Sequence, residues 1–113
     1  MIDPTQFMTE ILSMWFERDP AARRKAMADH FHPDVRFIDP DGTFVGYEGL
    51  EKFSDALQQR FPKDRFRLAS PPDHMADAVR AFWKLGEVTG MDFALFDGDK
   101  IKALYVFVPR PKH

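Results

Sequence analysis

The sequence predicts one α+β domain over residues 1–113, with three helices packed on one face of a curved, mostly antiparallel sheet. Apolar residues first recur every three or four positions in three separate segments that end at Phe61. From Arg65 onward they alternate with polar residues, which is the period of a strand. A chain of 113 residues, 44% of them hydrophobic, suits one compact domain and is too short for two.

The three predicted helices span about residues 4–17, 20–31 and 46–61. Asp3 and Asp19 each precede a proline, which places an N-cap residue before proline at the first helical position. Pro33 and Pro62 follow the second and third helices and stop them. The inward residues expected on the second helix are Ala22, Ala26, Met27, His30 and Phe31.

Two short strands are predicted at residues 35–39 and 43–46, on either side of a turn at residues 40–42. A further short strand is predicted at residues 65–70, before the turn Pro71-Pro72-Asp73. Three long strands then follow as a meander over residues 75–88, 91–97 and 100–108. Gly90 separates the first two, and Gly98-Asp99 forms the hairpin turn between the last two. On the first long strand Val79, Ala81, Trp83 and Leu85 face one way, and Arg80, Phe82 and Lys84 face the other.

Charge and composition exclude several kinds of site. The net charge is −2 with no block of like charge, so we expect no binding to nucleic acid or to a membrane. The absence of cysteine excludes disulfides, thiolate nucleophiles and sulfur-ligated metals, and the four histidines form no spaced cluster that predicts a metal site. Because no basic leader and no long apolar window are found, a soluble cytoplasmic protein is expected.

Asp39 is the first candidate functional residue. It shares one face of its strand with Val35 and Phe37, where a carboxylate is costly unless it is partnered or used. A structural interpretation is equally open, because aspartate before Pro40 commonly caps such a turn with its own side chain.

Two segments resemble the ketosteroid isomerase and SnoaL-like branch of the NTF2-like superfamily. They are HPDVRFIDPDGTFVGYEGLEKF at residues 32–53 and MDFALFDGDKIKALYVFV at residues 91–108, and the resemblance covers nearly the whole chain. It implies a cone-shaped fold with three N-terminal helices on a curved, mostly antiparallel sheet that encloses a pocket. It also implies a homodimer formed through the sheet. It does not fix one activity, because this fold hosts isomerases, cyclases, dehydratases, epoxide hydrolases and non-catalytic binders.

The resemblance also implies roles for particular residues. Asp39 matches the general base of the ketosteroid isomerases, and Asp92 matches the aspartate that stays protonated and donates a hydrogen bond to the enolate oxygen. Trp15 stands where that family has a tyrosine, so an indole N–H replaces the phenolic donor. Trp15 also continues an apolar helix face, which is the pattern of a core residue.

Removal of a proton next to a carbonyl group requires a base near the carbon acid and a hydrogen-bond donor aimed at the oxygen where charge develops. Asp92 lies in the middle of a strand, and burial there would keep its carboxyl group neutral. If the Gly98-Asp99 turn sets the register, Tyr105 lies across from Asp92 and supplies a phenolic donor, whereas a one-residue slip brings Leu104 or Val106 there. The predicted pocket-lining residues are Phe37, Phe53, Phe82, Ala94 and Phe96.

Three functions remain open. The first is an acid/base enzyme without cofactor that acts on a small, largely apolar carbonyl compound, with Asp39 as base and Asp92 as donor. In a hydrolase version, Arg80 lies between the two aspartates; in a structural interpretation, Arg80 or the backbone satisfies Asp92. The second is a protein that binds a small apolar or aromatic molecule without catalysis. The third is a dimeric assembly module whose cavity is filled by Phe37, Phe82, Phe93 and Phe107.

Overall fold

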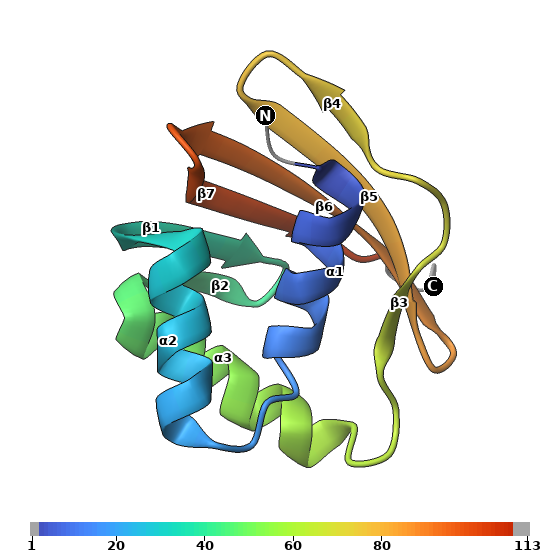
Figure 1. Ribbon diagram of the computed structural model, residues 1–113. Helices are drawn as coiled ribbons and strands as arrows, with labels where there is room; N and C mark the ends of the chain where they lie inside the picture. Colours follow the sequence, from blue (N-terminus) through green and yellow to red (C-terminus); the bar gives the residue numbers. More distant parts are fainter. Residues whose placement is uncertain (1–2, 110–113) are drawn as a thin grey trace.

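The computed structural model describes residues 3–109, and within them three helices accompany a curved, open sheet (Figure 1). The helices are α1 (Pro4–Met14), α2 (Pro20–His30) and α3 (Gly46–Arg60). The strands are β1 (Phe31–Asp39), β2 (Gly42–Val45), β3 (Phe66–Leu68), β4 (Asp73–Met75), β5 (Ala78–Leu85), β6 (Val88–Asp97) and β7 (Lys100–Phe107). The predicted α+β class is therefore confirmed.

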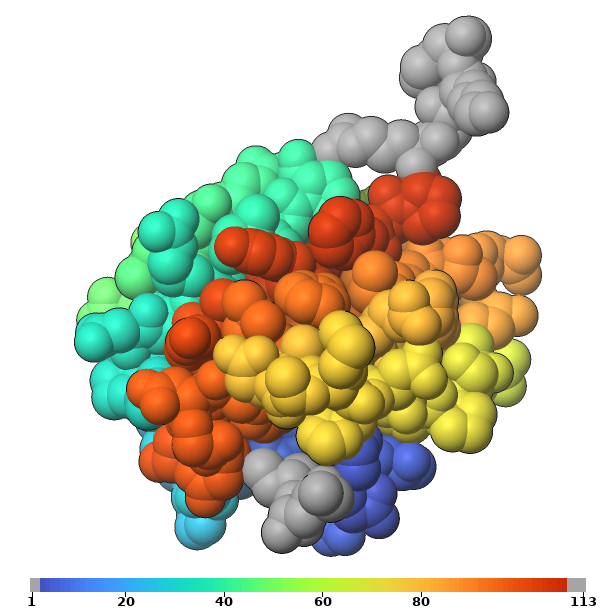
Figure 2. Space-filling model, turned by 90° about the horizontal axis from the view of Figure 1, so that it is seen from above, coloured from blue at the N-terminus to red at the C-terminus, as the bar shows by residue number. Residues whose placement is uncertain are grey.

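The strand order is β2-β1-β7-β6-β5-β3, with β4 pairing separately to β5. The sheet is mixed, because β1 and β7 are parallel while the other pairs are antiparallel. Seen from above, α1 (blue) lies on one side of β5 to β7 (yellow to red), and β1 to α3 (cyan to green) flank them (Figure 2). One face of the long strands is therefore covered by helix. Within residues 3–109 no helix is long and apolar enough to cross a membrane.

The helix starts follow the predicted caps. Asp3 Oδ1 accepts a hydrogen bond from the Thr5 backbone N–H, and Asp19 Oδ2 accepts one from Ala22. α1 ends at Met14, three residues earlier than predicted, because the next backbone N–H groups bond three residues back rather than four.

Two strand predictions need correction. β1 begins at Phe31 and contains Pro33, which is tolerated because the pairing with β7 is irregular between Phe31 and Arg36. The predicted long strand over residues 75–88 is interrupted by turns at residues 76–77 and 86–87, where Ala76 and Gly86 have positive φ angles of 52° and 58°. Gly90 therefore lies inside β6 and does not separate two strands.

The core lies between the helices and the inner face of the sheet. Val79, Ala81, Trp83 and Leu85 of β5 are buried, as the alternation predicts. The buried residues of α2 are Arg23 and Met27, whereas the predicted Ala22 is exposed. The guanidinium of Arg23 bonds Glu51, Ser54 and Asp55 of α3 and thereby links the two helices.

Candidate active site

A cavity of about 260 Å³ lies between the helices and the inner face of the sheet. Its wall is largely aromatic and aliphatic, and it includes the predicted residues Trp15, Phe37 and Phe53. Both candidate carboxylates, Asp39 and Asp92, line the same cavity, although they lie on different strands. The fold therefore brings together the two residues that the sequence analysis selected.

Asp92 is a buried carboxyl group on β6 with 3% of its surface exposed. Its neighbours directly across the sheet, Ala81 and Val106, are apolar. The indole Nε1–H of Trp83 donates a hydrogen bond to Asp92 Oδ1 over 2.8 Å. Burial raises the pKa of Asp92 to about 7, and the indole donor acts in the opposite direction. Asp92 can therefore gain or lose a proton near neutral pH.

The second oxygen of Asp92 remains open to the cavity. Among residues 3–109, no buried side-chain nitrogen or oxygen lacks a hydrogen-bond partner. Trp83 supplies the hydrogen bond to Oδ1, and Oδ2 has no partner in that part of the chain. An oxygen without a partner is therefore not fully buried, which means that Oδ2 keeps some accessible surface. The cavity that Asp92 lines provides this surface.

Asp39 is fixed by the turn that follows it. Its Oδ1 accepts hydrogen bonds from the backbone N–H groups of Asp41 at 2.8 Å and Gly42 at 3.1 Å. The structural interpretation of this residue is therefore correct. Its Oδ2 makes no hydrogen bond within the described part of the chain, and Asp39 is among the residues that line the cavity.

The predicted pairing of Tyr105 with Asp92 is wrong. The turn sets the expected register for Asp97 and Lys100, but a bulge between Leu95 and Phe96 shifts it by one residue. Val106 therefore lies across from Asp92. Tyr105 instead pairs with Phe93 on the other face of the sheet, where their rings stack at 6.5 Å.

Arg80 and three predicted lining residues lie elsewhere. Arg80 bonds Asp73 of β4, so it forms no Asp-Arg-Asp chain and does not contact Asp92. Phe82 is 42% exposed on the opposite face of the sheet. Ala94 is fully buried in the core, and Phe96 packs against Phe7 of α1 with ring centroids 5.1 Å apart.

Trp83 is the site residue that the sequence analysis missed. The alternation along the strand predicted that Trp83 shares a face with Val79, Ala81 and Leu85, which the structure shows buried, but it did not predict the hydrogen-bond partner of Trp83. The signal was the turn at Gly86, because a hairpin closed there pairs Trp83 with Gly90. Asp92 then follows two residues along on the same face, within reach of a large side chain. The misplaced break at Gly90 concealed this relationship.

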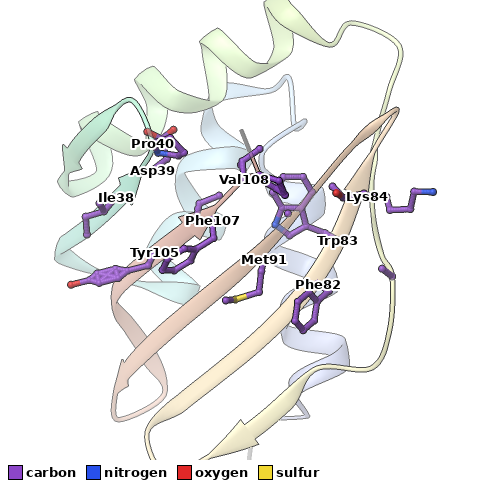
Figure 3. A pocket seen from close by; sticks show the side chains of 15 residues that line it. Ile38, Asp39, Pro40, Phe82, Trp83, Lys84, Met91, Tyr105, Phe107 and Val108 are labelled. Atoms are coloured by element: carbon purple, nitrogen blue, oxygen red, sulfur yellow. The ribbon is translucent and has the colours of Figure 1, made fainter. Parts of the chain in front are cut away.

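A second hollow of about 800 Å³ lies on the opposite face of the sheet. Phe82, Met91 and Tyr105 extend along it from the neighbouring strands β5, β6 and β7 (Figure 3). Phe107 also lines it and is 57% exposed. Asp39 and Trp83 line both hollows, so the two adjoin at this end of the sheet. Within residues 3–109, no group of three or more His, Asp or Glu side chains could hold a metal ion.

Structural comparisons identify several similar proteins. A candidate isomerase of the SnoaL-like family from Agrobacterium tumefaciens is 25% identical with a TM-score of 0.87, over 97% of this chain and 100% of that one. A candidate SnoaL-like polyketide cyclase from Jannaschia is 13% identical with a TM-score of 0.77, over 94% and 85%. A protein of ketosteroid isomerase-like fold from Catenulispora acidiphila, solved with trimethylamine, is 14% identical with a TM-score of 0.72, over 90% and 84%.

No curated protein matches the chain in sequence. Residues 9–104, however, match the SnoaL-like domain family, and this match spans most of the chain. The chain therefore belongs to the SnoaL-like domain family, within the NTF2-like superfamily.

Proposed function

We propose that this protein is an acid/base enzyme without cofactor that removes a proton next to the carbonyl group of a small, largely apolar compound. The observation that carries the proposal is the Asp92 carboxyl group, which is buried, has a pKa raised to about 7 and exposes Oδ2 to an apolar cavity. A carboxyl group in such surroundings can remain protonated at neutral pH and donate a hydrogen bond.

The two carboxyl groups have different roles, with Asp92 as the hydrogen-bond donor and Asp39 as the base. Neutral Asp92 donates from Oδ2 to the carbonyl oxygen, and this hydrogen bond strengthens as negative charge develops on the enolate. The Asp39 carboxylate accepts the carbon-bound proton on Oδ2, while the N–H groups of Asp41 and Gly42 hold Oδ1. Return of the proton to carbon restores Asp39 and completes an isomerisation or exchange without net consumption of protons.

The cavity limits the size of the substrate. A cavity of about 150 Å³ accommodates benzene. The inner cavity measures about 260 Å³ and has Phe37, Phe53 and Leu57 in its wall, which suits a compound of one or two rings. Such a wall selects by shape, and the two carboxyl groups select a carbonyl compound with an acidic C–H group.

Deuterium exchange tests the proposal without knowledge of the natural substrate. The protein is incubated in D₂O with one- and two-ring ketones such as indanone and tetralone, and loss of the α-proton signal is followed by NMR. We expect exchange above the buffer rate for at least one ketone, and a loss of about 100-fold or more in Asp92→Asn and Asp39→Asn. Asp73→Asn is the matched control, because Asp73 is exposed and bonded to Arg80. Exchange at the buffer rate with every ketone would contradict the proposal.

A non-catalytic binding protein is the second candidate, and the hydrogen bonds of Asp39 favour it. Asp39 already has a structural role in its turn, which a binding protein would need in the same way. In that case 2-naphthol binds in the inner cavity, Asp39→Asn retains the affinity, and no ketone exchanges.

We also propose that the outer face of the sheet pairs with a second copy of the chain. Phe82 and Phe107 are exposed there, and the stacked rings of Phe93 and Tyr105 continue the same face. An exposed apolar surface of this kind on neighbouring strands supports association. Burial of these aromatic side chains against the same residues of a partner would remove them from water.

A further inference from the structure

We propose that Trp83 is a positioning residue that holds the acidic proton of Asp92 on the oxygen facing the inner cavity. The inference deepens the proposed function and rests on it, since it states how the donor of that reaction is oriented. Trp83 acts through Asp92 and need not touch the substrate.

The indole N–H of Trp83 determines which oxygen of Asp92 carries the proton. An indole N–H can donate but cannot accept. Asp92 Oδ1, at 2.8 Å from Trp83 Nε1, must therefore act as the acceptor whether or not the carboxyl group is protonated. In the neutral acid the carbonyl-type oxygen is the better acceptor, so the proton is carried by Oδ2. Because Oδ2 is the oxygen that is open to the cavity, Trp83 directs the acid toward the ligand.

The packing of Trp83 holds the donor in place. Its indole lies across the sheet from Gly90, where the missing side chain leaves room for the six-membered ring. The Phe66 ring of β3 meets the indole edge to face, with centroids 5.0 Å apart at 82°. Trp83 is 4% exposed, so neighbouring atoms cover almost all of its surface. The register places Asp92 two residues beyond Gly90 on the same face, within reach of the indole N–H.

No charged side chain in the described part of the chain forms a hydrogen bond or an ion pair with Asp92. The residues across from it, Ala81 and Val106, are apolar. The other charged residues that line the cavity are Asp39, Asp41 and Arg60, and none of them forms a hydrogen bond or an ion pair with Asp92. Burial raises the pKa of Asp92, and the indole N–H lowers it by stabilising the ionised form. Loss of the N–H with burial retained should therefore raise this pKa further.

The experiment replaces the indole N–H by sulfur while keeping the shape of the ring. The chain has two tryptophans, so expression of Trp15→Phe with β-(3-benzothienyl)alanine substitutes position 83 alone. Trp15→Phe with ordinary tryptophan is the reference. The carboxyl carbon of Asp92 is titrated by NMR, and ketone exchange is measured on the same samples. We expect the pKa of Asp92 to rise by about one unit, and exchange to fall about tenfold.

The direction of the pKa change separates positioning from packing. If Trp83 only fills space, its replacement leaves the pKa of Asp92 unchanged, or lowers it by admitting water, and either result overturns the inference. 5-Fluorotryptophan at position 83 has a more acidic N–H and should lower the pKa. The same replacements in the wild-type chain, which alter both tryptophans, serve if Trp15→Phe does not fold. Absence of exchange in the wild type contradicts the proposed function, whereas the pKa change tests Trp83 independently.

Discussion

Trp83 lies directly across from Gly90, and a Cβ atom at residue 90 would approach Trp83 Cζ2 to 2.3 Å. No carbon atom fits at that distance, so a side chain at position 90 must displace the indole. The strand interior, where glycine normally weakens a sheet, is here the place where a large ring is accommodated. The glycine thereby determines where the donor of Asp92 lies.

Gly90→Ala should displace the indole and weaken its hydrogen bond to Asp92. We expect a loss of about 1–3 kcal/mol in the free energy of unfolding, as is usual for overpacking. The indole N–H resonance of Trp83 should move toward the position of a free indole. Urea unfolding and a nitrogen-proton correlation spectrum measure the two effects. Thr89→Ala, an exposed neighbour on the same strand, is the control. Wild-type stability with an unchanged indole signal would refute the contact.

Asp92 should make the stability of the protein depend on pH. Its pKa is about 7 in the folded state and about 3.9 when unfolded. Between these values the folded state keeps a proton that the unfolded state has lost, so stability falls as pH rises and levels off above pH 7. Three pKa units correspond to about 4 kcal/mol.

Asp92→Asn removes this dependence, because the amide is neutral at every pH and can still accept from Trp83. The stability of the wild type relative to Asp92→Asn should therefore decrease by about 4 kcal/mol from pH 4 to pH 8. Urea unfolding of both proteins at several pH values measures the difference. Parallel pH profiles for the two proteins would show that Asp92 titrates normally.

Asp39 offers a test that separates its structural role from chemistry. Asparagine can still accept the hydrogen bonds of Asp41 and Gly42, whereas alanine cannot. Asp39→Asn should retain wild-type stability, and Asp39→Ala should lose about 1–2 kcal/mol. Both variants should lose ketone exchange if Asp39 is the base. Ketone exchange by Asp39→Asn at the wild-type rate would show that Asp39 has only a structural role in its turn and is not the base.

Arg23→Ala should be among the more destabilising substitutions of a charged residue. It removes the buried guanidinium that bonds Glu51, Ser54 and Asp55, and it leaves Glu51 partly buried without that partner. We expect a loss of about 2–4 kcal/mol in the free energy of unfolding. Arg24→Ala, which removes an exposed ion pair to Glu51, should cost less than about 1 kcal/mol. Thermal or urea unfolding measures both variants, and equal losses of stability in Arg23→Ala and Arg24→Ala would show that the burial of Arg23 adds nothing to the stability of the protein.

Phe107→Asp tests association through the outer face of the sheet. A charge in the middle of an apolar interface is strongly unfavourable, so the variant should sediment as a monomer at concentrations where the wild type is a dimer. Val45→Asp is the control, because Val45 is also exposed but lies on the edge strand β2. A wild type that sediments as a monomer would contradict the proposal.

The sequence was most informative where the signal is local. The caps at Asp3 and Asp19, the alternation along β5 and the turn at Asp39 were all predicted from neighbouring residues. Each of these features depends on interactions within a few positions, so residue type and spacing suffice. Asp39 and Asp92 were likewise selected as carboxylates on apolar strand faces before their common cavity was known.

Only the tertiary structure decided which residues meet across the sheet. The bulge at Leu95 moved Tyr105 away from Asp92, and the turn at Gly86 brought Trp83 to it. Side chains alternate between faces, so a shift of one residue exchanges every partner, and a bulge has no strong local signature. The sequence by itself determined the fold class and the two carboxylates. The register of three strands, which depends on pairing between distant segments, determined that Asp92 has an indole donor.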